Sequence, residues 1–261
     1  MPRKKVHPTE KASGNLTIHK MVPNMMTIAA LCAGLTSIQF AISGRWEAAV
    51  MAIVIAAFID GFDGAAARLL NASSKLGAEL DSLSDFLCFG IAPTIVLYLW
   101  ALEAAGRFGW MAALVYSVAV ALRLARFNAM TKEETDKKNP LNMYFVGVPA
   151  PMGAGMAILP MVVAFQLDNP TWTHFLQQPV VAGSWALMFA GLMVSRVPTF
   201  SSKQVKLSQK LVVPVLATFG LIAAGLINAP WPTLTLLGIL YGILIPAGAF
   251  HFYYTQRKLK K

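Results

Sequence analysis

Charged residues are scarce in this 261-residue chain, at 13% of the sequence, whereas hydrophobic residues make up 56%. A soluble domain usually carries about 25% charged residues, so this composition excludes an ordinary soluble domain and predicts a membrane protein. Cysteine is also scarce: Cys32 and Cys88 each lie in an apolar stretch. We interpret both as small core residues, which excludes a disulfide framework and a cysteine metal site.

Long apolar segments predict an all-α polytopic membrane protein of about eight transmembrane helices. A helix needs about 20 mostly apolar residues to cross the hydrocarbon core of a bilayer. The predicted spans are residues 25–43, 46–67, 76–102, 110–127, 148–165, 180–194, 211–227 and 234–253. The short span at 180–194 makes the count uncertain by one. The transmembrane domain is thus 24–254, between an N-terminal segment at 1–23 and a basic tail at 255–261.

The basic residues predict the orientation of these spans. All 22 Lys and Arg residues except Arg45 and Arg107 fall in the N-terminal segment, in alternate loops and in the tail. Because Lys and Arg concentrate on the cytoplasmic side of membrane proteins, we expect both termini in the cytoplasm. This topology accounts for the net charge of +10 and suits contact with anionic membrane lipids. Nucleic acid is therefore not expected as a partner.

Five of the 12 acidic residues lie between positions 60 and 85, within or at the ends of the second and third spans. Acidic residues at membrane depth are costly and usually mark a functional site. Asp60 and Asp63 are three residues apart and Asp81 and Asp85 four apart, so each pair shares one helix face. Both pairs have a comparable depth from the cytoplasmic side. We expect the hairpin of the two spans to bring them together.

Four carboxylates in one place require neutralising cations. Oxygen ligands without Cys or His favour Mg²⁺ or Mn²⁺, with Ca²⁺ as an alternative, and a pair of ions about 3.5–4 Å apart suits phosphoryl displacement. Gly64 and Gly77 either admit a ligand or simply allow helix packing. Arg68 either binds phosphate or anchors a helix end. The residues thus favour phosphate chemistry with divalent metal.

These residues form one pattern, Asp60-x2-Asp63-Gly64-x2-Ala67-Arg68-x8-Gly77-x3-Asp81-x3-Asp85. It resembles, at every defined position, the signature of the CDP-alcohol phosphatidyltransferases. The resemblance implies that Asp60, Asp63 and Asp81 bind one metal ion. It implies that Asp60, Asp81 and Asp85 bind a second ion, and that Asp85 is also the catalytic general base.

The same resemblance implies a binding site for a CDP-linked lipid. It places Gly64, Arg68 and Ser74 at this lipid and Asn24 and Thr27 near its nucleotide. For Asn24 an alternative stays open, because Pro-Asn is also an ordinary helix-start signal.

Three further segments, at 123–128, 145–151 and 194–200, resemble the membrane-embedded bacterial phosphatidylserine synthases of that family. This resemblance implies transfer of a phosphatidyl group from CDP-diacylglycerol to L-serine, by a homodimer in the bacterial inner membrane with a cytoplasmic active site. Candidate acceptor-binding residues are Arg123, Arg126 and Asn128. The arginines could instead anchor a cytoplasmic helix end, and Asn128 could cap the helix.

Two other functions stay open from the sequence. The acceptor could be glycerol 3-phosphate, inositol phosphate or choline, because the acidic pattern defines only the donor chemistry. A cation transporter could also use membrane aspartates, although we find no internal repeat of the kind that many transporters have. Independently of function, Gly147, Pro149 and Pro151 predict an irregular backbone before the fifth span. Such a backbone must be packed in protein or line a cavity.

Overall fold

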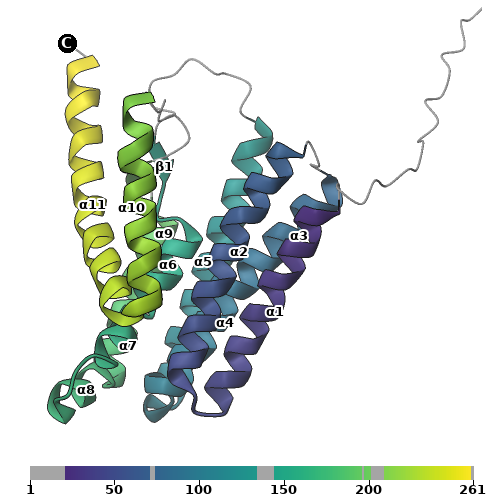
Figure 1. The fold of residues 1–261 in the computed structure, drawn as a ribbon. Coiled ribbons are helices and arrows are strands. Elements are labelled where there is room, and N and C mark those ends of the chain that lie inside the picture. The colour runs from purple at the N-terminus through teal and green to yellow at the C-terminus, as the bar shows by residue number, and fades with distance from the viewer. Residues whose placement is uncertain (1–20, 71–73, 134–143, 196, 201–208, 260–261) are drawn as a thin grey trace, which may run out of the picture.

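The computed structural model describes residues 21–70, 74–133, 144–195, 197–200 and 209–259, which form a bundle of helices (Figure 1). In chain order the elements are α1 (Val22–Ile42), α2 (Trp46–Leu69), α3 (Lys75–Asp85), η2 (Phe86–Ile91), α4 (Ala92–Leu97), η3 (Tyr98–Leu102), η4 (Glu103–Ala105), α5 (Arg107–Glu133), β1 (Tyr144–Val146), α6 (Ala150–Ala157), α7 (Leu159–Ala164), α8 (Pro170–Leu176), α9 (Pro179–Val194), β2 (Pro198–Phe200), α10 (Gln209–Asn228) and α11 (Pro230–Leu259). The predicted all-α class is confirmed, apart from the two three-residue strands. Most of the predicted N-terminal segment lies outside the described residues.

The predicted number of membrane spans is not confirmed by the described part of the chain. Five helical stretches in the described part of the chain are long and apolar enough to cross a bilayer. The α8–α9 pair, bent by 50°, makes a sixth if it counts as one span. The predicted fifth span is divided into α6 and α7, because Pro160 in the first turn of α7 has no N–H to continue the preceding helix. The chain is therefore a multi-pass membrane protein, but eight spans are not confirmed.

Close helix packing begins with α1 and α2, which run side by side through the first part of the bundle (Figure 1). The buried positions of α1 recur every three or four residues and are mostly small, which lets neighbouring helices approach closely. At Gly34 a Cβ atom would lie 2.8 Å from Cys88 Sγ. The interpretation of Cys88 as a core residue is confirmed. For Cys32 it is wrong, because Cys32 lies on the exposed face of α1.

A π-helical turn, η2, follows directly after Asp85. Pro93 lacks the N–H that the carbonyl oxygen of Phe89 would accept in an α-helix. Tyr116 on α5 instead donates a hydrogen bond to Phe89 O at 3.5 Å, and the N–H of Ala92 bonds five residues back to Leu87 O. The acidic helix α3 packs against α1, while η2 and α4 also pack against α5.

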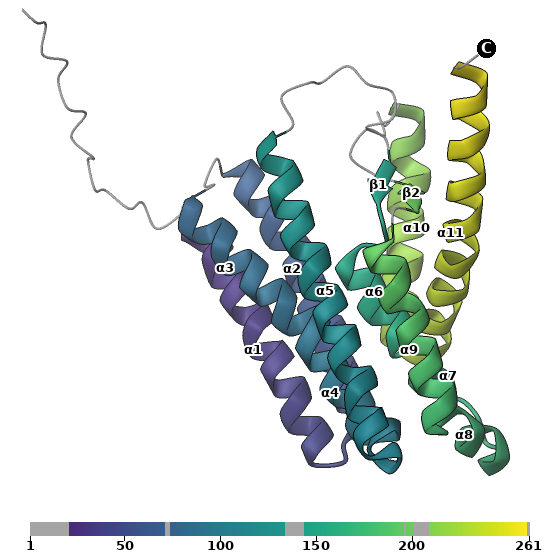
Figure 2. The same cartoon turned by 180° about the vertical axis from the view of Figure 1, so that it is seen from behind.

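The irregular backbone predicted before the fifth span is confirmed. β1 pairs with β2 in an antiparallel ladder that lies beside α6 (Figure 2). Gly147 follows with φ of +83°, a conformation that favours glycine, and its N–H donates to Val197 O at 2.9 Å. Val148 is completely buried. This segment is therefore packed in protein, between α5 and α9.

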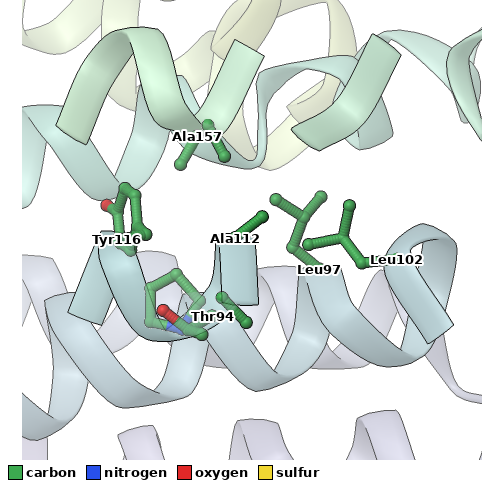
Figure 3. Close-up of a pocket in the computed structure, with 9 residues that line it drawn as sticks. Thr94, Leu97, Leu102, Ala112, Tyr116 and Ala157 are labelled. Carbon is green, nitrogen blue, oxygen red and sulfur yellow. The ribbon is translucent and has the colours of Figure 1, made fainter. Parts of the chain in front are cut away.

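A small apolar pocket lies between α4, α5, α6 and α9 (Figure 3). Its polar side chains are already paired: Thr94 Oγ1 donates to Gly90 O at 2.6 Å and accepts from Ser117 Oγ at 3.0 Å. Its lining includes Leu97, Leu102 and Ala157 and no charged residue. The pocket is a packing feature and not a substrate site.

Candidate active site

The predicted meeting of acidic residues across the α2–α3 hairpin is present in the structure. One carboxylate oxygen from each of Asp60, Asp63 and Asp81 lies within 4.8 Å of the others. Asp63 is buried and the other two are half-buried. Oxygen ligands held at about 2.0–2.6 Å from one Mg²⁺ or Ca²⁺ ion are at most about 4–5 Å apart. The three acids therefore have a spacing that one divalent cation could bridge.

Asp85 extends this group from the C-terminal end of α3. Its carboxyl group lies within hydrogen-bonding reach of the Asp60 carboxyl group. Its Oδ1 atom is buried and has no hydrogen-bond partner among the described residues. Buried polar atoms are nearly always paired, and a buried unpaired carboxylate is especially costly. The possible ligand atoms in this group are all carboxylate oxygens, and one of them is unpaired. Such a group fits a hard divalent cation or a substrate that donates a proton.

Thr27 of α1 holds one of these acids in place. Its hydroxyl donates to Asp63 Oδ2 at 2.7 Å and also lies 3.1 Å from Pro23 O. The Thr27 carbonyl in turn accepts from Ser84 Oγ of α3 at 3.3 Å. Three helices therefore meet at Thr27, and the residue expected near the nucleotide contacts the acid cluster.

The beginning of α3 lies against the beginning of α1. Ser74 caps α3 by accepting the Gly77 N–H at 2.9 Å. A Cβ atom at Gly77 would lie 2.7 Å from Asn24 Oδ1, so a glycine lets these two helices approach. In contrast, a Cβ atom at Gly64 would meet nothing within 4 Å, which leaves open space beside Asp63. The backbone of Arg68 belongs to α2, but its side chain lies outside the described part of the structure.

The two candidate arginines of α5 have different surroundings. Arg126 donates hydrogen bonds to the carbonyls at the end of α9, including Nη1 to Val194 O at 2.8 Å and Nη2 to Ser195 O at 3.2 Å. Arg123 donates from Nε to Val148 O at 2.5 Å and interacts electrostatically with Asp85. Arg126 thus joins α5 to α9, whereas Arg123 joins α5 to Val148 and interacts electrostatically with Asp85.

Asn128 and Tyr241 complete the polar surroundings. Asn128 Nδ2 donates to Ser82 Oγ at 2.9 Å, which joins α5 to the acidic helix α3. Tyr241 of α11 has a buried hydroxyl that interacts electrostatically with Arg123. The sequence offered no sign of Tyr241, because an aromatic residue in an apolar span is usually structural and only the folded chain places it near α5.

Replacing Thr27 by Val is expected to weaken metal binding. Val keeps the shape of the side chain but removes the donor to Asp63, and partners that orient ligands typically contribute about 10–100-fold to metal affinity. We expect the dissociation constant for Mn²⁺, measured by calorimetry, to rise at least about tenfold. Thr36→Val on the same helix removes only a bond to Cys32 O and is the control. Equal Mn²⁺ affinity of the Thr27 variant and the wild type would contradict this role.

Comparison with known proteins agrees with this geometry. The family model described as CDP-alcohol phosphatidyltransferase matches residues 20–197, and the one described as CDP-alcohol phosphatidyltransferase 2 matches residues 210–246. A CDP-diacylglycerol–serine O-phosphatidyltransferase of Mycobacterium leprae (strain TN) is 36% identical over 239 residues, which cover 92% of this chain and 77% of the relative. One from Helicobacter pylori (strain ATCC 700392 / 26695) is 33% identical over 204 residues, 77% of this chain and 81% of the relative. The chain belongs to the CDP-alcohol phosphatidyltransferase family.

Proposed function

We propose that this protein transfers the phosphatidyl group of CDP-diacylglycerol to the hydroxyl of L-serine, giving phosphatidylserine and CMP. The observation that carries this proposal is the convergence of the acidic side chains of α2 and α3 within the membrane bundle. The choice of serine is supported by the names of relatives that cover most of the chain. Glycerol 3-phosphate, inositol phosphate and choline fit those names less well.

The family depends on divalent metal, and the acid cluster could hold an ion. We propose two ions, Mg²⁺ or Mn²⁺, with Asp60, Asp63 and Asp81 holding one and Asp60, Asp81 and Asp85 the other. When bound, such ions would stabilise negative charge on the diphosphate and on the departing CMP. The open space beside Gly64 would leave room for the diphosphate next to these acids.

Asp85 would act as the general base. Its unpaired Oδ1 can accept the proton of the serine hydroxyl. The serine oxygen then attacks the lipid-side phosphorus, a new phosphorus–oxygen bond forms, and the bond to CMP breaks. Holding both substrates in one site replaces a bimolecular encounter by an intramolecular step.

The remaining site residues would position the two substrates. Asn24, Thr27, Gly64, Arg68 and Ser74 would surround the CDP-lipid, since the described atoms of most of them lie at the joined ends of α1, α2 and α3. On the acceptor side, Arg123 would bind the serine carboxylate, because it interacts electrostatically with Asp85. Arg126 and Asn128 would support that site by fixing α9 and α3.

We also propose a bacterial inner-membrane location with the termini and the active site on the cytoplasmic side. The C-terminal ends of α2, α5 and α11 and the N-terminal end of α3 lie at the same end of the bundle (Figure 1). Among the described residues, Arg68, Lys75, Lys132, Arg257 and Lys258 belong to these helix ends. On this proposal 24–254 is the catalytic domain and 255–261 a cytoplasmic tail. A homodimer is proposed from the family resemblance alone.

Competition between acceptors tests the proposed substrate. Purified protein with CDP-diacylglycerol and Mn²⁺ or Mg²⁺ is given L-serine, glycerol 3-phosphate, inositol phosphate or choline, and CMP release and the lipid product are measured. We expect serine to be preferred by at least about 10²-fold, because a site built to bind the charged groups of one acceptor rejects others. CMP release with a different acceptor only would replace serine by that alcohol. Ion flux without CMP release would favour a transporter.

A further inference from the structure

We infer that Tyr241 is a specificity-determining residue for the acceptor: its hydroxyl and the guanidinium group of Arg123 together bind the carboxylate of an α-amino acid. This inference rests on the proposed function, since it concerns the acceptor of the same reaction. It adds a residue from α11, which lies more than a hundred positions after the acidic pattern.

The face of α11 that carries Tyr241 is turned toward the bundle. A Cβ atom at Gly238 would lie 2.7 Å from Leu159 Cδ1, and one at Gly242 would lie 3.6 Å from Met156 Cε. Ile245, four residues after Tyr241, is buried. Residues three or four apart share a helix face, so Tyr241 lies on the same inward stripe. Its ring packs against the buried core.

Contacts at the beginning of α11 fix this helix against its neighbours. Gln166 Nε2, just after α7, donates to Thr235 Oγ1 at 2.6 Å. The rings of Phe165 and Trp231 pack edge to face with their centroids 4.9 Å apart. The position of Tyr241 is therefore set by packing that does not involve its own hydroxyl.

Hydrogen-bonding capacity near Tyr241 is left unused. Among the described residues, the Tyr241 hydroxyl and Asp85 Oδ1 are the buried side-chain polar atoms without a partner. Arg123 uses Nε for Val148 O, and neither of its terminal nitrogens has a hydrogen bond within the described structure. Arg123 interacts electrostatically with both Asp85 and Tyr241. Arg123 is thus the charged group that interacts with both of the unpaired groups.

The chemistry of these groups matches a small zwitterion with a hydroxyl. A carboxylate accepts from the forked nitrogens of arginine and from a phenol, and such charge-assisted bonds are short and strong. The ammonium and hydroxyl of the same molecule would then be directed toward the carboxylate of Asp85. An acceptor without a carboxylate would leave the Tyr241 hydroxyl unpaired, which a buried site disfavours.

Tyr241→Phe tests this inference, because it removes only the hydroxyl and keeps the ring that packs on the core. Steady-state CMP release is measured with L-serine, and separately with ethanolamine, which keeps the hydroxyl and ammonium but lacks the carboxylate. We expect the KM for serine to rise about tenfold, as the loss of one hydrogen bond to a charged group implies. The kcat, the KM for CDP-diacylglycerol and the kcat/KM for ethanolamine should change less than about twofold.

Tyr98→Phe, in the π-helical turn η3, is the matched control and should leave all these constants unchanged. A serine KM for Tyr241→Phe within about twofold of wild type would overturn the inference, as would an equal loss with serine and ethanolamine. A wild-type enzyme that releases no CMP with serine would overturn the proposed function and this inference with it. The wild-type measurement therefore separates the two failures.

Discussion

Asp85→Asn is expected to lower CMP release by at least about 10³-fold, because a positioned general base typically contributes about 10²–10⁴-fold. Asn has nearly the same shape as Asp, so the end of α3 and its contact with Asp60 can remain. It cannot accept the serine proton, and it removes one carboxylate from the cluster. CMP release with saturating CDP-diacylglycerol, serine and Mn²⁺ is the measurement.

The Asp85 experiment needs a binding readout and a control on the same helix. Glu79→Gln removes an exposed acid of α3 and should retain wild-type activity. Binding of CDP-diacylglycerol to the Asp85 variant should stay within a few fold of wild type, which excludes loss of the fold. CMP release by Asp85→Asn within tenfold of wild type would rule out Asp85 as the base.

The second large effect is expected from Asp60, which belongs to the three-acid group and also reaches Asp85. Both proposed metal sites include it, so Asp60→Asn should weaken both at once. Residues that merely orient metal ligands contribute about 10–100-fold, so losing a ligand should raise the half-maximal Mn²⁺ concentration for CMP release by at least about 100-fold. The measurement is a Mn²⁺ titration of chelator-treated enzyme.

Asp168→Asn makes the same chemical change at an exposed position outside the cluster and is the control. Chelator treatment of the wild type should abolish CMP release, and added Mg²⁺ or Mn²⁺ should restore it. An unchanged Mn²⁺ titration for Asp60→Asn would show that this carboxylate does not bind the activating metal.

The acid cluster could be predicted from the sequence because its geometry is local. Asp60 and Asp63 share a face of one helix, Asp81 and Asp85 share a face of the next, and a short connection makes the two helices antiparallel neighbours. The cost of carboxylates at membrane depth then requires that the faces meet. The periodicity of α-helices and the cost of charge in a bilayer were therefore sufficient to predict this part of the site.

Other features depend on partners far along the chain. Arg123 and Arg126 look equivalent in sequence, but in the folded chain Arg123 interacts electrostatically with Asp85, whereas Arg126 bonds to the end of α9. Tyr241 reaches the site only because α11 packs on α6 and α7 through glycines. The division of the fifth predicted span at Pro160 was missed, because hydropathy does not depend on whether a residue has a backbone N–H. Hydropathy also cannot tell a lipid-facing Cys32 from a buried one.

The π-helical turn at Phe86–Ile91 constrains how this region can change by insertion or deletion. A single π turn is equivalent to one residue added to an α-helix, and each residue rotates a helix by about 100°. Because the wider turn absorbs this residue, deleting one residue there would restore an α-helix and keep α4 in contact with α5, whereas a deletion within α4 would rotate the residues after it by about 100°. The turn can therefore lose one residue without moving the acids or α4, whereas the spacing between the acids cannot change.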